Sequence, residues 1–205
     1  MDEYFGMFLE EFGEPFNRRE VPISSLERYR HRLPEQLLKY WKEYGWAGYG
    51  RGLFWIVNPQ EYEGVISAWL QGTELEDKDK FHVIARSAFG QIFLWGEKFG
   101  PAVRLSTLNS YAIVSSGFNS PPDDLDFEVK YFFAFLDQPT RDPDVYFESA
   151  LRRLGLLNDT QMYGFVPALA LGGQRDAENL ERVSAVEHMT FLAQLDQLTI
   201  LRLPE

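Results

Sequence analysis

The sequence contains no cysteine, which excludes disulfide bonds, thiolate metal sites and cysteine nucleophiles. It also lacks a run of about 18 apolar residues that could span a bilayer. Its first residues, Met1–Tyr4, are acidic where a secretory signal would be basic. We therefore expect a cytoplasmic protein that makes no contact with a membrane.

Histidine is scarce, because only His31, His82 and His188 occur. His82 alternates with Ile84 along an expected strand, which favours a partly buried structural histidine. His188 has no second histidine at a metal-ligand spacing, so a zinc site is not indicated. His31 stands among three arginines, a pattern typical of a solvated segment, with a phosphate site as the alternative. We expect no metal and no other cofactor.

The motifs of common enzyme classes are missing too. There is no G-x-S-x-G pattern, which serine hydrolases use to expose their nucleophile. The glycine-rich stretches at 48–52 and 172–175 do not follow a strand and open a helix, as a phosphate-binding loop would. We interpret both as turns and expect a protein that is not an enzyme.

Acidic residues outnumber basic ones, giving a net charge of −11. Residues 1–110 hold 16 acidic and 13 basic side chains, whereas the remainder holds 15 and 7, so the excess is concentrated in the second half. A nucleic acid would need Lys and Arg to neutralise its phosphates, so direct binding of nucleic acid is not expected. An acidic surface instead favours a basic protein partner.

Candidate contacts for such a partner lie near the middle of the chain. Several carboxylates cluster there without the twelve-residue spacing and central glycine of a calcium loop. A cluster of this kind is often only a solvated segment, but it could also steer a basic protein. The candidate binding residues are Asp123, Asp124, Asp126, Glu128, Asp142 and Asp144.

Aromatic residues are abundant, since seventeen Phe, ten Tyr and five Trp make up 16% of the chain. Such rings dominate protein cores and also anchor interfaces. We expect most of them to be in the core.

Turn-forming residues at 117–124, with a glycine, a proline pair and two acids, suggest a boundary between two domains. Before it, apolar spacing predicts helices at 2–12 and 34–44, a strand at 53–57, a helix after Asn58 and a hairpin at 81–95. After it, we expect helices at 125–136 and 144–154, strands at 164–171 and 180–183, and a helix capped by Ser184 and Glu187. The predicted fold is α+β, with two small mixed domains, each having helices packed on a mainly antiparallel sheet.

Several strings in the first half resemble the GAD-like domain, namely Leu33–Trp41, Gly52–Pro59 and His82–Gly90. In the second half, Met162–Gly173 and Val186–Leu195 resemble the domain paired with it in Tdi-type immunity proteins. The resemblance implies a GAD-like domain at 1–116, a linker at 117–124 and a Tdi-type C-terminal domain at 125–205.

Tdi-type proteins are encoded beside type VI secretion DNase effectors and protect the producing cell by binding the toxin. The resemblance therefore implies a stoichiometric complex with a cognate secreted nuclease, but it does not assign the surface that contacts the toxin. The excess of acidic residues, and not the resemblance, makes the acidic candidates the expected contacts. Two alternatives remain open at this point. GAD domains also occur in proteins that handle aminoacyl-tRNA, and the chain could be a general protein-interaction module without a toxin partner.

Overall fold

The structure of the chain, a computed structural model, describes residues 2–115, 118, 120–138, 141–142 and 145–203. Before the linker it contains α1 (Glu3–Phe12), β1 (Phe16–Arg19), α2 (Ile23–Tyr29), α3 (Glu35–Tyr44), β2 (Trp46–Tyr49), β3 (Phe54–Ile56), α4 (Glu63–Leu70), β4 (Phe81–Ser87), β5 (Gln91–Gly96), β6 (Gly100–Ser106) and β7 (Tyr111–Val114). After it come α5 (Leu125–Ala134), α6 (Phe147–Leu154), β8 (Gln161–Phe165), β9 (Leu180–Ser184), α7 (Ala185–Leu192) and β10 (Thr199–Arg202).

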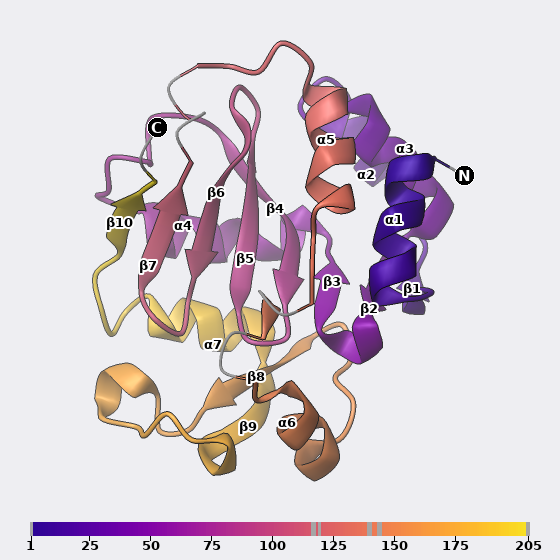
Figure 1. Cartoon of the computed structure of the whole chain (residues 1–205). Coiled ribbons are helices and arrows are strands. Elements are labelled where there is room, and N and C mark those ends of the chain that lie inside the picture. Colours follow the sequence, from indigo (N-terminus) through magenta and orange to yellow (C-terminus); the bar gives the residue numbers. More distant parts are fainter. Residues whose placement is uncertain (1, 116–117, 119, 139–140, 143–144, 204–205) are drawn as a thin grey trace.

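One eight-stranded sheet forms the centre of the molecule, in the order β1-β2-β3-β4-β5-β6-β7-β10 (Figure 1). Every neighbouring pair in it is antiparallel except the last, because β10 runs parallel to β7, with Thr199 opposite Tyr111 and Arg202 opposite Val114. A separate two-stranded sheet pairs β8 with β9. The α+β prediction with mainly antiparallel strands is confirmed.

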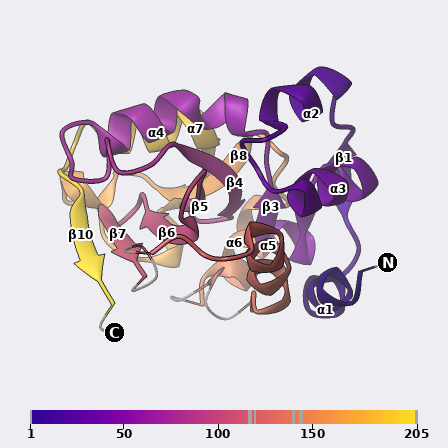
Figure 2. The ribbon, with the colours of Figure 1, turned by 90° about the horizontal axis from the view of Figure 1, so that it is seen from above.

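Two hydrophobic clusters lie on opposite faces of the large sheet. Successive side chains of a strand point to opposite faces, so Phe54 and Ile56 of β3 join one cluster while Trp55 joins the other. The first cluster receives residues of α1, α2, α3 and α5. The second receives residues of α4, α6, α7 and the small sheet. Figure 2 shows α4 and α7 on one side of the central strands and α1 and α5 on the other.

Local signals in the sequence explain where several helices begin and end. The Asp2 carboxylate accepts hydrogen bonds from the backbone N–H groups of Tyr4 and Phe5, which caps α1. Helix α3 ends at Gly45, whose φ of 73° favours glycine. A Cβ there would lie 2.4 Å from the carbonyl oxygen of Arg19, so no other residue fits without a shift of β1.

Helices α1 and α3 and the β4–β5 hairpin lie where the sequence predicts them. The strand predicted at 164–171 is wrong in its second part, because β8 ends at Phe165 and residues 169–171 form a 3-10 turn. Pro167 has no N–H to offer a neighbouring strand. The predicted capping box of α7 is also wrong, since the Ser184 side chain makes no capping hydrogen bond.

Two elements that follow residues 117–124 pack with the first part of the chain. Helix α5 contributes Val129 and Phe133 to the cluster that contains α1 and α3, and Leu136 just after the helix joins them. Strand β10 extends the central sheet at its β7 edge. The division of the chain at 117–124 stays a prediction, and residues 116, 117 and 119 lie outside the described residues.

Candidate functional site

The acidic candidates near the start of α5 mostly have structural contacts. The Asp124 carboxylate accepts a hydrogen bond from the Phe127 backbone N–H at 3.0 Å and so caps α5. The Asp126 carboxylate accepts one from the Gln36 backbone N–H at 2.8 Å, which joins α5 to the first turn of α3. Asp123 is exposed, and Glu128 is half-buried. Asp123, Asp124 and Asp126 line one shallow hollow together.

The other two candidates lie elsewhere in the chain. Asp142 accepts hydrogen bonds from the backbone N–H groups of Tyr146 and Phe147, at 2.8 and 2.9 Å, where α6 begins. Asp144 lies outside the described residues. The structure therefore brings Asp123, Asp124 and Asp126 together, places Asp142 at a different helix start, and leaves the binding role of the whole set a prediction.

An exposed row of aromatic side chains on α5 is the clearest feature that sequence reasoning missed. Phe127, Tyr131 and Phe135 are 45%, 50% and 63% exposed, and we call these three residues the aromatic stripe. Their spacing of four places them on one side of the helix. The ring centroids of Tyr131 and Phe135 are 4.2 Å apart, and those of Phe127 and Tyr131 are 6.4 Å apart.

The opposite face of α5 is buried in the core through Val129, Phe133 and the nearby Leu136. A helix that is apolar on more than one face needs more than one apolar neighbour. The sequence contained evidence for this second apolar face. Residues 127, 131 and 135 fall on one side of the expected helix, and residues 129, 133 and 136 fall on another. The high aromatic content led us to assign most of these rings to the core, so the second face was not recognised.

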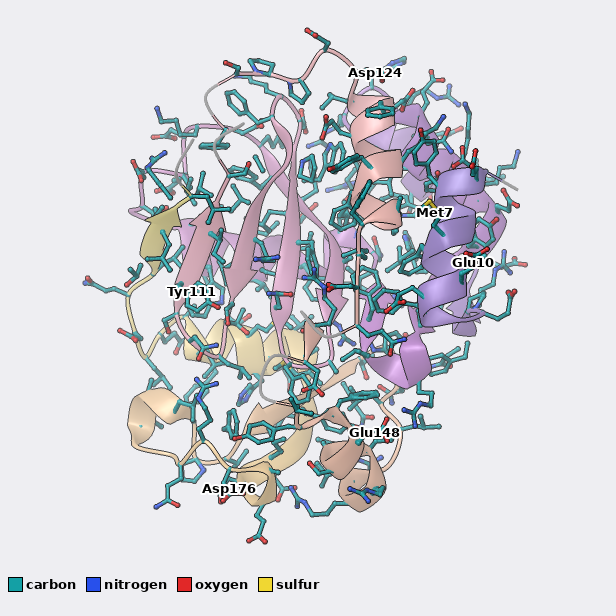
Figure 3. The ribbon with its side chains drawn as sticks, in the orientation of Figure 1. Met7, Glu10, Tyr111, Asp124, Glu148 and Asp176 are labelled. Carbon is teal, nitrogen blue, oxygen red and sulfur yellow. The ribbon has the colours of Figure 1, made fainter. Side chains whose placement is uncertain are left out.

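On the side that faces α1, the surroundings of the aromatic stripe are acidic. On the side of α1, Tyr4 packs edge-on against Phe127 with a centroid distance of 6.0 Å, and Met7 is 45% exposed. Glu3, Glu10 and Glu11 are exposed on the same helix. Figure 3 shows Met7 beside α5, Glu10 on the outer side of α1 and Asp124 at one end of α5. The surface formed by α1 and α5 thus combines exposed apolar rings with an acidic margin.

The histidines have structural environments. The His82 Nε2 and the Arg32 Nε both lie within hydrogen-bonding distance of Glu97 Oε1, at 2.8 and 2.9 Å. Burial lowers the pKa of His82, and its hydrogen bond to Glu97 offsets this only in part. Burial alone would raise the pKa of Glu97, but its hydrogen bonds with His82 and Arg32 hold that pKa below its ordinary value. Burial also lowers the pKa of His188.

Within the described part of the chain, no three His, Asp or Glu side chains converge in a way that could hold a metal ion. None of the helices described is long and apolar enough to cross a membrane.

Comparison with known proteins identifies both parts of the chain. Residues 3–109 match the GAD-like domain family. Residues 126–196 match the family of the C-terminal part of the type VI secretion immunity protein Tdi1. No curated protein matches the chain.

A solved structure shares the fold of the chain over nearly its whole length. The crystal structure of Atu4351 from Agrobacterium tumefaciens is 25% identical in sequence and superposes with a TM-score of 0.87. The match covers 98% of this chain and 93% of that one. Because the GAD-like match covers more than half of the chain, the chain belongs to the GAD-like domain family, and its second part matches the C-terminal family of the type VI secretion immunity protein Tdi1.

Proposed function

We propose that the chain binds a cognate type VI secretion DNase effector in the cytoplasm and neutralises it in a stoichiometric complex, without catalysing a reaction. The observation that carries this proposal is the exposed aromatic stripe on α5 with its acidic margin. Aromatic side chains are enriched among the residues that dominate binding energy at interfaces. A nuclease must present basic residues to DNA, so an acidic protein complements that surface.

In this proposal the two kinds of residue have different roles. Phe127, Tyr131 and Phe135 supply the apolar contact area, because they are exposed on a helix that the core holds in place. We assign Asp123 to the acidic margin, together with the exposed Glu3, Glu10 and Glu11 of α1. Charges at the margin of an interface mainly raise the rate of association, whereas anchors in its centre slow dissociation.

The first test is co-purification of the chain with the nuclease encoded beside it, followed by a DNA-cleavage assay with increasing amounts of the chain. We expect a complex in moderate salt and loss of cleavage once the two proteins are equimolar. Cleavage that persists with the chain in excess would contradict the proposal. Binding of tRNA at physiological salt, without a nuclease complex, would instead favour an RNA-associated module.

Variants of the aromatic stripe test which surface binds. Because Tyr131 and Phe135 are exposed, Tyr131→Ser and Phe135→Ser should leave the fold intact and lower affinity for the effector by at least about tenfold each. Leu171→Ser is the matched control, since Leu171 is 58% exposed but lies on the turn after β8. If the control weakens binding as much as the stripe variants, or the stripe variants bind normally, α5 is not the binding surface.

A further inference from the structure

An open hollow of about 450 Å³ lies on the same face of the sheet as α5, between that helix and strands β5 and β6. Its walls are mainly apolar, and its size falls within the range of about 300–1,000 Å³ that is usual for small-molecule sites. The aromatic side chains that line it are Phe93, Phe99, Tyr131, Phe132 and Phe135.

Two arginines, Arg104 of β6 and Arg141 beyond α5, also line this hollow. The Arg141 side chain is only 6% exposed, and its guanidinium lies over the Phe93 ring at 4.8 Å from the centroid. Its Nη1 donates to Gln91 Oε1 at 2.7 Å, but its buried Nε has no acceptor among the described residues. The buried Nε of Arg104 likewise has none.

The positive charge of the two guanidinium groups is poorly compensated. Arg141 forms a long ion pair with Asp137, whose carboxylate is half-exposed and 3.8 Å away. Arg104 forms no ion pair with a described residue, and neither does Glu128, although Glu128 also lines the hollow. Burial, together with the charge of Arg104, lowers the pKa of Arg141 to about 10. A buried donor without an acceptor costs free energy that a bound anion would recover.

We propose that this hollow binds a small organic anion, whose carboxylate or phosphate group contacts Arg104 and Arg141 and whose flat apolar part packs against Tyr131, Phe132 and Phe135. Arginine is well suited to such groups because its planar fork can donate two parallel hydrogen bonds to one anion. The aromatic walls favour a ring as the apolar part. The site needs no effector to bind its ligand, but it shares Tyr131 and Phe135 with the proposed effector-binding surface.

Isothermal titration calorimetry of the full chain with four probes tests the ligand chemistry. Phenyl phosphate and benzoate carry the ring and one of the two anionic groups, benzyl alcohol carries the ring alone, and inorganic phosphate carries the anion alone. We expect at least one aromatic anion to bind about tenfold or more tightly than both benzyl alcohol and inorganic phosphate. Whichever of phenyl phosphate and benzoate binds more tightly shows whether the site prefers a phosphate or a carboxylate. Absence of binding by both, or equal binding of benzyl alcohol, would overturn the proposal.

Variants then test the two arginines. Arg104 is only half-buried, so Arg104→Gln should fold normally and lower the affinity for the aromatic anion by about tenfold or more. Arg182→Gln is the matched control, because Arg182 is exposed on β9 and should leave affinity unchanged. Arg141→Gln should lower the affinity for the aromatic anion to a similar extent. If Arg141→Gln fails to fold, the affinity of Arg104→Gln alone tests the site. Wild-type affinity in Arg104→Gln would overturn the site. None of these measurements uses the nuclease, so their failure would leave the proposed function untouched.

Discussion

Arg86 is a fully buried cation whose hydrogen bonds go to neutral acceptors. Its Nε donates to the Tyr62 hydroxyl and its Nη2 to the Asp159 carbonyl, both at 2.9 Å, while the guanidinium lies over the Trp55 ring at 5.2 Å. Because Arg86 belongs to β4 and Asp159 precedes β8, this side chain joins the large sheet to the start of the small one. A buried charge of this kind is stable only when its donors are satisfied.

Replacing Arg86 with alanine should therefore lower the free energy of unfolding by about 3 kcal/mol or more. The variant leaves a cavity beside Trp55 and removes the donor that faces the Asp159 carbonyl. Urea denaturation followed by tryptophan fluorescence measures the change. Arg182→Ala, at an exposed position, is the control and should change stability by less than about 0.5 kcal/mol. A similarly small effect of Arg86→Ala would show that the buried contacts are not stabilising.

The lowered pKa of His82 makes stability dependent on pH. As the pH falls through the pKa of histidine in the unfolded chain, about 6.5, the unfolded state gains a proton that the buried ring does not accept. The free energy of unfolding should therefore decrease between about pH 7 and pH 5, with a further contribution from His188. Each unit of difference in pKa corresponds to about 1.4 kcal/mol.

The Glu97 carboxylate makes stability depend on pH in a lower range than His82 does. Its stabilising hydrogen bonds are fully present above its unfolded pKa and are lost as the pH falls through the lowered pKa in the folded state. Urea titrations at several pH values separate the effect of His82 from that of Glu97. They compare wild type with His82→Gln and with the control His31→Asn, which changes an exposed histidine. His82→Gln should reduce the slope between pH 7 and pH 5, whereas an unchanged slope would exclude His82 as its cause.

At the scale of elements, α5 stabilises its neighbour α3. The residue before α3 is Pro34, which makes no side-chain capping hydrogen bond. The Asp126 carboxylate of α5 supplies the missing acceptor for the Gln36 N–H. This contact gives one of the predicted toxin-binding carboxylates a structural function, and it explains how α5 is held against α3.

Asp126→Ala should consequently cost about 1 kcal/mol of stability, as the loss of a helix cap typically does. Asp123→Ala, three positions earlier and exposed, should have an effect below about 0.5 kcal/mol. Urea denaturation of both variants measures the difference, and effector binding can be measured on the same samples. Equal stability of the two variants would argue against the capping role of Asp126. A loss of affinity in Asp123→Ala at unchanged stability would support the acidic margin.

Elements specified by short-range signals could be predicted from the sequence. Asp124 caps α5, Asn58 caps the turn before α4, and Gly45 and Gly155 end α3 and α6, in agreement with the expected positions. Strands β1 and β10 were not predicted, because each has four residues and is defined by its pairing partner rather than by its own pattern. The second, exposed face of α5 was missed for a different reason, because its aromatic rings at 127, 131 and 135 were assigned to the core although their spacing of four was visible in the sequence.

At the scale of the whole molecule, the net charge of −11 should affect how fast a basic partner associates. Attraction between exposed charges is screened within about 10 Å at 0.1 M salt. We therefore expect the association rate with the effector to fall by tenfold or more as salt increases from about 0.02 M to 0.5 M, with a smaller change in the dissociation rate. Surface plasmon resonance at several salt concentrations measures both rates. An association rate that does not depend on salt would exclude electrostatic steering.

The parallel pairing of β10 with β7 also affects the order in which the chain folds during synthesis. Strand β7 leaves the ribosome long before residues 199–202 do, so its outer edge has no partner until those residues have been made. Pairings between segments so distant in sequence form slowly, and an unpaired strand edge favours aggregation. Completion of the central sheet thus waits for residues 199–202, and truncation at residue 198 should yield a protein that is prone to aggregate.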